Sequence, residues 1–303
     1  MAIGKYIKEI GRGKDGARSL TREQAADLFG QVLDGEVTDL EIGAFCLAMR
    51  IKGETAQEMA GFLDATHARL HKVPTSCTTV VLPSYNGARK LPVLTPLLAL
   101  LLAREGLSVV VHGMTSESTR ISAQNVLEAL EIRAEAAIKK IAPGTVQFIP
   151  TALLCPGLER LLEVRRVVGL RNSAHSLVKL MNPCDAPAIV VGSYTHPEYA
   201  ASMTATFSLI GANALLLRGT EGEPVADPRR TPAMDAFLGG DVSRVQEAQA
   251  GSLMTVPGLP APDAHSTATW IKAVLNGTEP TPEPIALQVA HIVHLAKTMS
   301  KTP

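Results

Sequence analysis

Five short apolar runs alternate with helical segments after Pro74, and this alternation restricts the fold more than any other feature of the chain. The expected strands are residues 78–82, 107–112, 146–149, 188–192 and 214–218. They are apolar throughout rather than at every second position, which is typical of strands covered on both faces. Strands of this kind separated by helices are typical of parallel sheets. The sequence therefore predicts the α/β class, with a central, mostly parallel sheet.

The first 74 residues show helical patterns only. Three times a threonine is followed three residues later by Gln or Glu, the signature of a helix N-terminus, at Thr21 and Gln24, Thr38 and Glu41, and Thr55 and Glu58. We therefore expect a small N-terminal helical bundle domain, residues 1–74, and a larger α/β domain, residues 75–303. Further helices are expected at 93–104, 119–131, 156–168, 173–180, 197–210, 266–275 and 284–299, and those near 156–180 are expected to pack on the bundle.

Composition narrows the possible partners. Lys+Arg and Asp+Glu both number 29, so a nucleic-acid contact would need a local basic patch. The four cysteines have no metal-ligand spacing and indicate reduced core thiols. The charged N-terminus has no apolar run, so we expect no signal peptide, no membrane partner and a cytoplasmic location.

The segment 80–102 reads VVLPSYNGARKLPVLTPLLALLL, a strand, a turn and an apolar helix. This layout is typical of a phosphate-binding loop, in which backbone N–H groups before a helix face an anion. Such loops usually contain several glycines, whereas only Gly87 is present here. Arg89 and Lys90 follow it directly.

Three loops that follow predicted strands or helices could share one crevice, because ligands bind beyond the carboxyl ends of strands in open α/β sheets. The loops are residues 83–90, 112–119 and 169–175. Their candidate donors to phosphate or sugar oxygens are Ser84, Asn86, Arg89, Lys90, His112, Thr115, Ser116, Ser118, Arg171, Asn172 and His175. Each alone is more often a solvated loop residue, but their clustering after successive strands favours a site.

Two segments carry a resemblance to anthranilate phosphoribosyltransferases. They are HGMTSESTRISAQNVLEALEI (112–132) and FIPTALLCPGLERLLEVRRVVGLRNSAHSLVKLMNP (148–183). The helical first 70 residues fit that family as well. The resemblance implies a nucleoside phosphorylase/phosphoribosyltransferase-like fold and a homodimer formed through the helical part.

The departures from that family lie at its catalytic motifs. Its GTGGD loop, which holds the diphosphate, falls on residues 83–87, and its KHGNR motif falls on residues 111–115. Its magnesium-binding acid pair falls on Pro224 and Val225. An enzyme that stabilises a departing diphosphate needs magnesium and preorganised donors, so the sequence favours a protein without phosphoribosyltransferase activity, catalytic residues or cofactor.

The substituted motifs PSYNGARK, VVVHG, FIP, RNSAHSLVKL and HPEY…RGTEGE resemble those of the YbiB branch of this superfamily, also called TrpD-like or glycosyltransferase family 3. The resemblance implies DNA or RNA binding. Residues 1–22 hold six cations against two acids, and further cations are expected near the crevice. The proposed phosphate contacts are Ser84, Asn86, Arg89, Lys90, His112, Arg165, Arg171, Asn172, His175 and Lys179. Tyr6 and Tyr85 are the expected stacking aromatics.

Two alternatives remain open at this stage. The first is a phosphoribosyltransferase or nucleoside-processing enzyme that acts with magnesium held by Glu221, Glu223 and Asp227. The second is a sensor that keeps a small-molecule pocket. For the homodimer, the apolar positions Ile42, Phe45 and Met49 could face a partner or be buried within the bundle.

Overall fold

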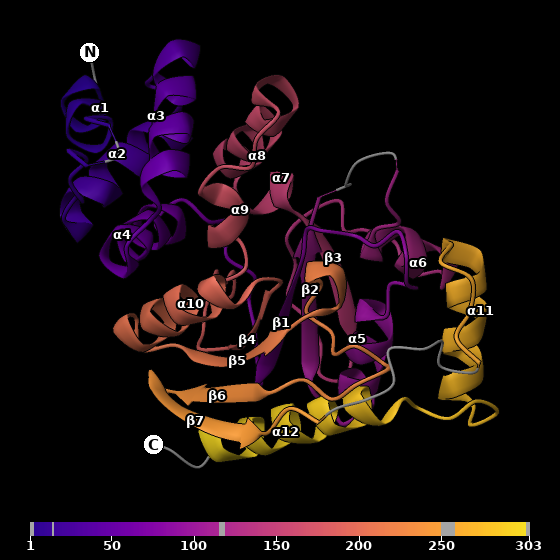
Figure 1. Cartoon of the computed structure of the whole chain (residues 1–303). Coiled ribbons are helices and arrows are strands. Elements are labelled where there is room, and N and C mark those ends of the chain that lie inside the picture. Colours follow the sequence, from indigo (N-terminus) through magenta and orange to yellow (C-terminus); the bar gives the residue numbers. More distant parts are fainter. Residues whose placement is uncertain (1–2, 14, 115–118, 250–257, 301–303) are drawn as a thin grey trace.

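The computed structural model describes residues 3–13, 15–114, 119–249 and 258–300. A helical domain at the N-terminus stands beside a larger α/β domain, as predicted (Figure 1). The helical domain begins with α1 (Gly4–Ile10), α2 (Arg22–Asp34), α3 (Asp39–Lys52) and α4 (Ala56–His67). All three capping boxes form, so the local signals at Thr21, Thr38 and Thr55 set where α2, α3 and α4 begin.

The α/β domain is built on a seven-stranded sheet in the order β3-β2-β1-β4-β5-β6-β7. The five expected strands are present and parallel: β1 (Thr79–Ser84), β2 (Ser108–Gly113), β3 (Val146–Pro150), β4 (Ile189–Tyr194) and β5 (Asn213–Arg218). An antiparallel hairpin, β6 (Met234–Leu238) and β7 (Asp241–Gln246), extends the β5 edge. No pattern in the sequence predicted this hairpin.

Helices cover both faces of the sheet. On one side of the sheet, the strands share a hydrophobic core with α5 (Thr95–Arg104), α6 (Ala123–Ala129), α11 (Ala264–Leu275) and α12 (Glu283–Met299), and α11 packs on α6. The other face packs against α10 (Pro197–Leu209), whose Phe207 is fully buried. Successive residues of β1 alternate between the two cores, with Val80 and Leu82 in one and Val81 in the other. This double coverage explains why the strands are apolar throughout.

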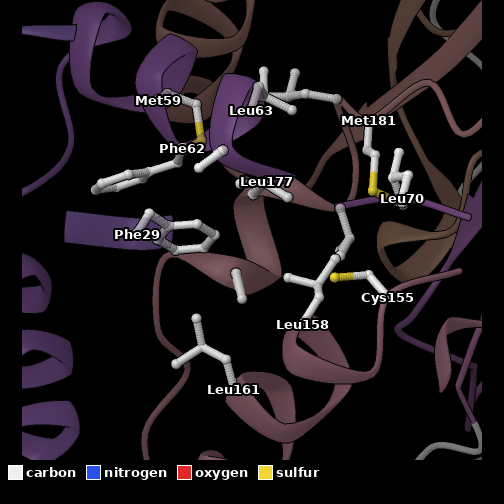
Figure 2. Close-up of a cluster of buried hydrophobic side chains, with 14 of the residues drawn as sticks. Phe29, Met59, Phe62, Leu63, Leu70, Cys155, Leu158, Leu161, Leu177 and Met181 are labelled. Atoms are coloured by element: carbon white, nitrogen blue, oxygen red, sulfur yellow. The ribbon is translucent and has the colours of Figure 1, made fainter. Parts of the chain in front are cut away.

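The segment between β3 and β4 completes the core of the helical domain. It contains α7 (Thr151–Leu154), α8 (Pro156–Val168) and the single turn α9 (Ala174–Leu177). Figure 2 shows Leu177 near the rings of Phe29 and Phe62, which are stacked with their centroids 4.6 Å apart, and Leu158 beside Cys155 in the same cluster. The chain after β3 is thereby fixed to α2 and α4.

A glycine allows α8 to approach α2 closely. A Cβ atom on Gly157 would lie 2.1 Å from the carbonyl oxygen of Leu33, a separation that no side chain tolerates. The Arg160 guanidinium also donates to Leu33 O at 2.9 Å. Helix α8 therefore packs on the helical domain although it lies in the α/β half of the sequence.

Several local expectations differ from the structure. Helix α6 begins only at Ala123 because Ser122 caps it, and the expected helix at 173–180 is reduced to α9. Phe45 and Met49 are fully buried within the helical domain, so they cannot face a partner. The four cysteines are free thiols, as expected. Within the described ranges, none of the helices has the length and apolar character needed to cross a bilayer.

Candidate functional site

The strand order places a crevice beside the ends of β1 and β4. From β1 the chain moves outward through β2 and β3, and it then returns to place β4 on the other side of β1. At such a reversal the loops after the two central strands separate and leave an opening at the carboxyl edge of the sheet. Here those loops carry Tyr85 and Asn86 after β1 and Thr195 and His196 after β4.

Two adjoining cavities form this crevice. The first, of about 270 Å³, lies between the β1 loop and α8 and is lined by Asn86, Met114, Leu162 and His175 among others. The second, of about 430 Å³, lies between α3, α4, α10 and the β4 loop, and Asn86 and His175 line it too. Because both cavities share these two residues, we treat them together as the basic crevice.

Cations outnumber acids along the basic crevice. Among the residues that the structure describes, six cationic side chains line it against three acidic ones: Arg50, Arg120, Arg165, Arg166, Arg171 and Lys179, against Glu54, Glu163 and Glu198. Part of this charge is compensated locally, since Arg166 Nε lies 2.6 Å from Glu163 Oε2 and Arg120 Nη1 lies 3.9 Å from Glu221 Oε2. His175 adds no charge, because burial, helped by Arg171 and Arg165, lowers its pKa to about 3. The remaining excess of cations favours anionic ligands.

The β1 loop has the amide donors expected of a phosphate-binding loop, but a carboxylate of the chain accepts from them. Glu223 Oε1 accepts from the backbone N–H groups of Asn86 and Gly87, at 3.0 and 2.9 Å. Its Oε2 accepts from Ser84 Oγ at 2.5 Å and from Thr95 Oγ1 at 3.0 Å. Only 1% of Glu223 is exposed. Both carboxylate oxygens are thus fully satisfied by groups that would otherwise face an anion.

A second carboxylate holds the other half of the same loop. Glu221 Oε1 accepts from the backbone N–H groups of Lys90 and Leu91 at 2.9 and 3.0 Å. Glu221 has a positive φ of 50°, which is uncommon for a residue other than glycine. Residues 219–223, which we call the GTEGE segment, therefore supply carboxylates to the whole turn after β1.

The glycines of the GTEGE segment permit its close approach to the crevice floor. Gly222 has φ +89°, and a Cβ atom there would lie 1.8 Å from Asn86 Nδ2. Its carbonyl accepts from Lys179 Nζ at 2.8 Å and from Ser193 Oγ at 2.9 Å. Neither a side chain at Gly222 nor a looser approach would allow these contacts.

Lys179 is the buried cation beneath the second cavity. Burial lowers its pKa to about 8, although the charge of nearby Glu223 acts in the opposite direction. Besides Gly222 O, its ammonium group donates to Ser193 O at 3.2 Å. Lys179 thus connects the chain after α9 with β4 and the GTEGE segment more than it offers charge to solvent.

The structure brings most of the predicted contacts together but buries several of them. Ser84 is bound to Glu223, and His112 is fully buried with its Nδ1 2.8 Å from Tyr85 Oη. Burial lowers the pKa of His112 to about 3, so it is neutral. Ser84 and His112 therefore cannot contact a ligand in this conformation, which corrects both assignments. Tyr85 and Tyr6 are also buried and offer no exposed ring for stacking.

The other predicted residues divide into three groups. Asn86, Arg165, Arg171, Asn172, His175 and Lys179 line the basic crevice. The side chain of Asn172 nevertheless donates to Leu161 O at 2.7 Å, which holds the turn before α9. Arg89 and Lys90 are exposed but line neither cavity. Thr115, Ser116 and Ser118 lie outside the described residues.

Some residues of the crevice were not selected from the sequence. Arg120 lines the first cavity and donates to Gly87 O at 3.1 Å, and Tyr194, His196 and Tyr199 line the second. The signal for His196 and Tyr199 was the HPEY motif after the fourth strand, whereas no motif indicated Arg120 or Tyr194. Of the N-terminal cations, Arg12 and Arg18 pair with Glu9 and are not part of the crevice.

Comparison with known proteins identifies the family. A model of the helical bundle domain of the glycosyl transferase family matches residues 5–69. YbiB of Escherichia coli (strain K12) is 42% identical over 304 residues, which cover 96% of this chain and 93% of that protein. The chain belongs to the YbiB type of the TrpD-like glycosyltransferase family 3 superfamily.

More distant relatives agree with this placement. The anthranilate phosphoribosyltransferase of Nocardioides sp. (strain ATCC BAA-499 / JS614) is 28% identical over 266 residues, covering 85% of this chain and 78% of that enzyme. The Thermus thermophilus enzyme superposes on 100% of this YbiB-type chain and 90% of its own, with a TM-score of 0.75 and 21% identity. The Saccharomyces cerevisiae enzyme, solved in complex with PRPP and Mg, covers 97% and 88% with a TM-score of 0.69 and 14% identity. These solved structures share the fold.

The acids of this YbiB-type protein do not fit a magnesium site. Glu221 and Glu223 accept from loop donors, and Asp227 Oδ2 lies 2.8 Å from the Arg229 guanidinium. Among the described residues no group of three or more His, Cys, Asp or Glu side chains could hold a metal ion. We therefore assign no step to magnesium.

The buried ammonium of Lys179 predicts a pH dependence of stability. Its folded-state pKa of about 8 is below the ordinary 10.5, so the unfolded chain binds more protons between these values and stability rises with pH in that window. From about pH 8 to about pH 10, the free energy of unfolding of the wild type should rise by roughly 2 kcal/mol relative to Lys179→Met. Urea unfolding at several pH values measures this difference. Parallel pH curves for the two proteins would contradict the assignment.

Proposed function

We propose that this protein binds single-stranded DNA or RNA along the basic crevice, as a homodimer and without phosphoribosyltransferase activity. The observation that carries the proposal is the excess of cationic side chains along an open crevice at the carboxyl edge of the sheet. Phosphate contacts dominate affinity for nucleic acids, and Lys and Arg provide them.

The chemistry of the crevice favours contact with phosphates over reading of bases. Arginines lie along both cavities, and in our proposal the exposed Arg89 and Lys90 extend the path beyond them. Tyr199, 38% exposed, and His196 offer ring faces at the far end, where bases can stack without regard to sequence. Binding should therefore depend little on sequence.

Affinity should fall steeply with salt, because each neutralised phosphate releases counterions. About five contacts on a single strand give a log–log slope near −3.5, at about −0.7 per contact. Replacing Arg165 and Arg171 together with alanine should weaken binding to unrelated sequences equally and flatten the slope by about 1 to 2 units. The measurement is a salt titration of oligonucleotide binding by fluorescence anisotropy.

The matched control is Arg104→Ala with Lys140→Ala. Arg104 is the last residue of α5. Lys140 is two residues before Ala142, whose carbonyl accepts from Ser108 Oγ at the start of β2. Both cations therefore lie near the edge of the sheet opposite the crevice. The control should keep the wild-type slope. If the control pair weakened binding as much as the Arg165 and Arg171 pair, the nucleic acid would not lie in the basic crevice. Loss of binding to one sequence only would contradict phosphate contact as the main interaction.

The occupied loop supports the absence of phosphoribosyl transfer. A diphosphate ligand would need the donors of Ser84, Asn86 and Gly87, which Glu223 accepts from. With anthranilate, phosphoribosyl diphosphate and magnesium, we therefore expect no product above a blank without protein. Anthranilate fluorescence follows the reaction, with an active anthranilate phosphoribosyltransferase as the positive control. Turnover that Arg171→Ala abolishes would contradict this prediction.

An exposed apolar stripe on α3 supports the homodimer. Leu40, Leu47 and Ile51 are 83%, 47% and 63% exposed, and their spacing of seven and four residues places them on one side of the helix. Leu47 and Ile51 also border a cavity of about 290 Å³ against α1. These residues, rather than Phe45 and Met49, are the candidates for contact with a second copy.

A charge on this stripe should separate the subunits. We expect Leu47→Glu with Ile51→Glu to give a monomer by light scattering at a concentration at which the wild type is a dimer, with an unchanged helical circular dichroism signal. Val242→Glu is the control, because Val242 is 50% exposed on β7, on the other domain. A wild type that is monomeric at micromolar concentration would end the homodimer proposal.

A further inference from the structure

The turn after β1 keeps a complete set of anion donors although no external anion is needed to satisfy them. Two backbone N–H groups, of Asn86 and Gly87, and two hydroxyls, of Ser84 and Thr95, converge on one carboxylate. All four of these residues are buried. An apolar replacement of the carboxylate would leave all four donors without this acceptor, which is costly in a buried site.

The acceptor comes from a distant part of the chain. Glu223 lies 137 residues after Asn86, on a segment that reaches the turn only because Gly222 approaches Asn86 and because Lys179 and Ser193 hold the Gly222 carbonyl. The turn is therefore not closed by a local hydrogen-bonding pattern of its own. Its donors meet a negative charge that a separate segment inserts.

We propose that Glu223 is a specificity-determining residue that excludes phosphate from the β1 turn by occupying its donors, and that these donors bind inorganic phosphate once the carboxylate is removed. A carboxylate and a phosphate both present oxygens to N–H and O–H donors at about 2.5–3.0 Å. The two therefore compete for one place, and the covalently attached carboxylate has the advantage of proximity. Phosphates of a larger ligand are thereby directed to the arginines farther out in the crevice.

The test replaces Glu223 with alanine and compares thermal unfolding in phosphate and in chloride of equal ionic strength. Saturating phosphate should raise the Tm of Glu223→Ala by about 3–6 °C over chloride, because a ligand that binds only the folded state stabilises it. The wild type should shift by less than about 1 °C. Titration calorimetry with inorganic phosphate should then give one site per chain for Glu223→Ala and none for the wild type.

Two further variants separate a specific site from general destabilisation. Leu97→Ala removes a fully buried side chain of α5 and weakens the fold without opening the turn, so its Tm should not depend on phosphate. Ser84→Ala in the Glu223→Ala background removes one donor and should weaken phosphate binding at least several-fold. If phosphate binds equally well to this double variant, the site lies elsewhere and the proposal is wrong.

The proposal can also be decided if Glu223→Ala does not fold in chloride. Phosphate should then restore the circular dichroism signal of the folded state, and failure to do so would overturn the proposal. A folded Glu223→Ala whose Tm is the same in phosphate and chloride would overturn it as well. The result does not depend on nucleic-acid binding, because none of these variants changes an arginine of the crevice.

Discussion

The shape of the crevice depends on the hydrogen bonds that the Glu223 carboxylate accepts from the β1 turn. A buried carboxylate is tolerated only when donors surround it, and buried donors need an acceptor in return. Ser84, Gly87 and Glu223 meet both requirements at once. The contact fixes the GTEGE segment against β1, which in turn places the Gly222 carbonyl over Lys179. Lys179 and Ser193, which both donate to that carbonyl, line the second cavity.

The same interaction separates the two kinds of ligand that a basic crevice could take. A small phosphorylated ligand needs donors that converge on one point, and here that point holds a side chain of the chain itself. A polyanion instead needs charges spread along a path, which Arg50, Arg165 and Arg171 provide across the two cavities. The internal carboxylate and the outer arginines therefore both favour a polyanion over a small phosphorylated ligand. The fold shared with the phosphoribosyltransferases does not by itself imply their activity.

The sequence predicted those features that depend on short-range patterns. The five parallel strands were predicted because double coverage makes every position apolar, and α2, α3 and α4 because capping boxes mark where helices begin. The hairpin β6–β7 was missed because β7, DVSRVQ, lies on an edge and is largely exposed, so it lacks an apolar run. The adjacent Gly239 and Gly240 at its turn were the available signal. Helical periodicity places Phe45 and Met49 on one side of α3 and Leu47 and Ile51 on another, but it does not show which side the rest of the protein covers.

For the site, the sequence by itself determined which polar groups are present and in which loops they lie. These are a turn of the anion-binding type with few glycines, the cations near it, and the acids in RGTEGE. The sequence offered Glu221 and Glu223 as metal ligands, since acids near a phosphate-type loop suit that role. Only the tertiary structure decided that they accept from the turn itself, and that Ser84 and His112 are buried while Arg165 and Arg171 line the crevice. The physical reason is distance along the chain. Hydrogen bonds between residues about 130 to 140 positions apart, as between Glu223 and Ser84, leave no spacing in the sequence, whereas a helix cap joins residues three apart and does.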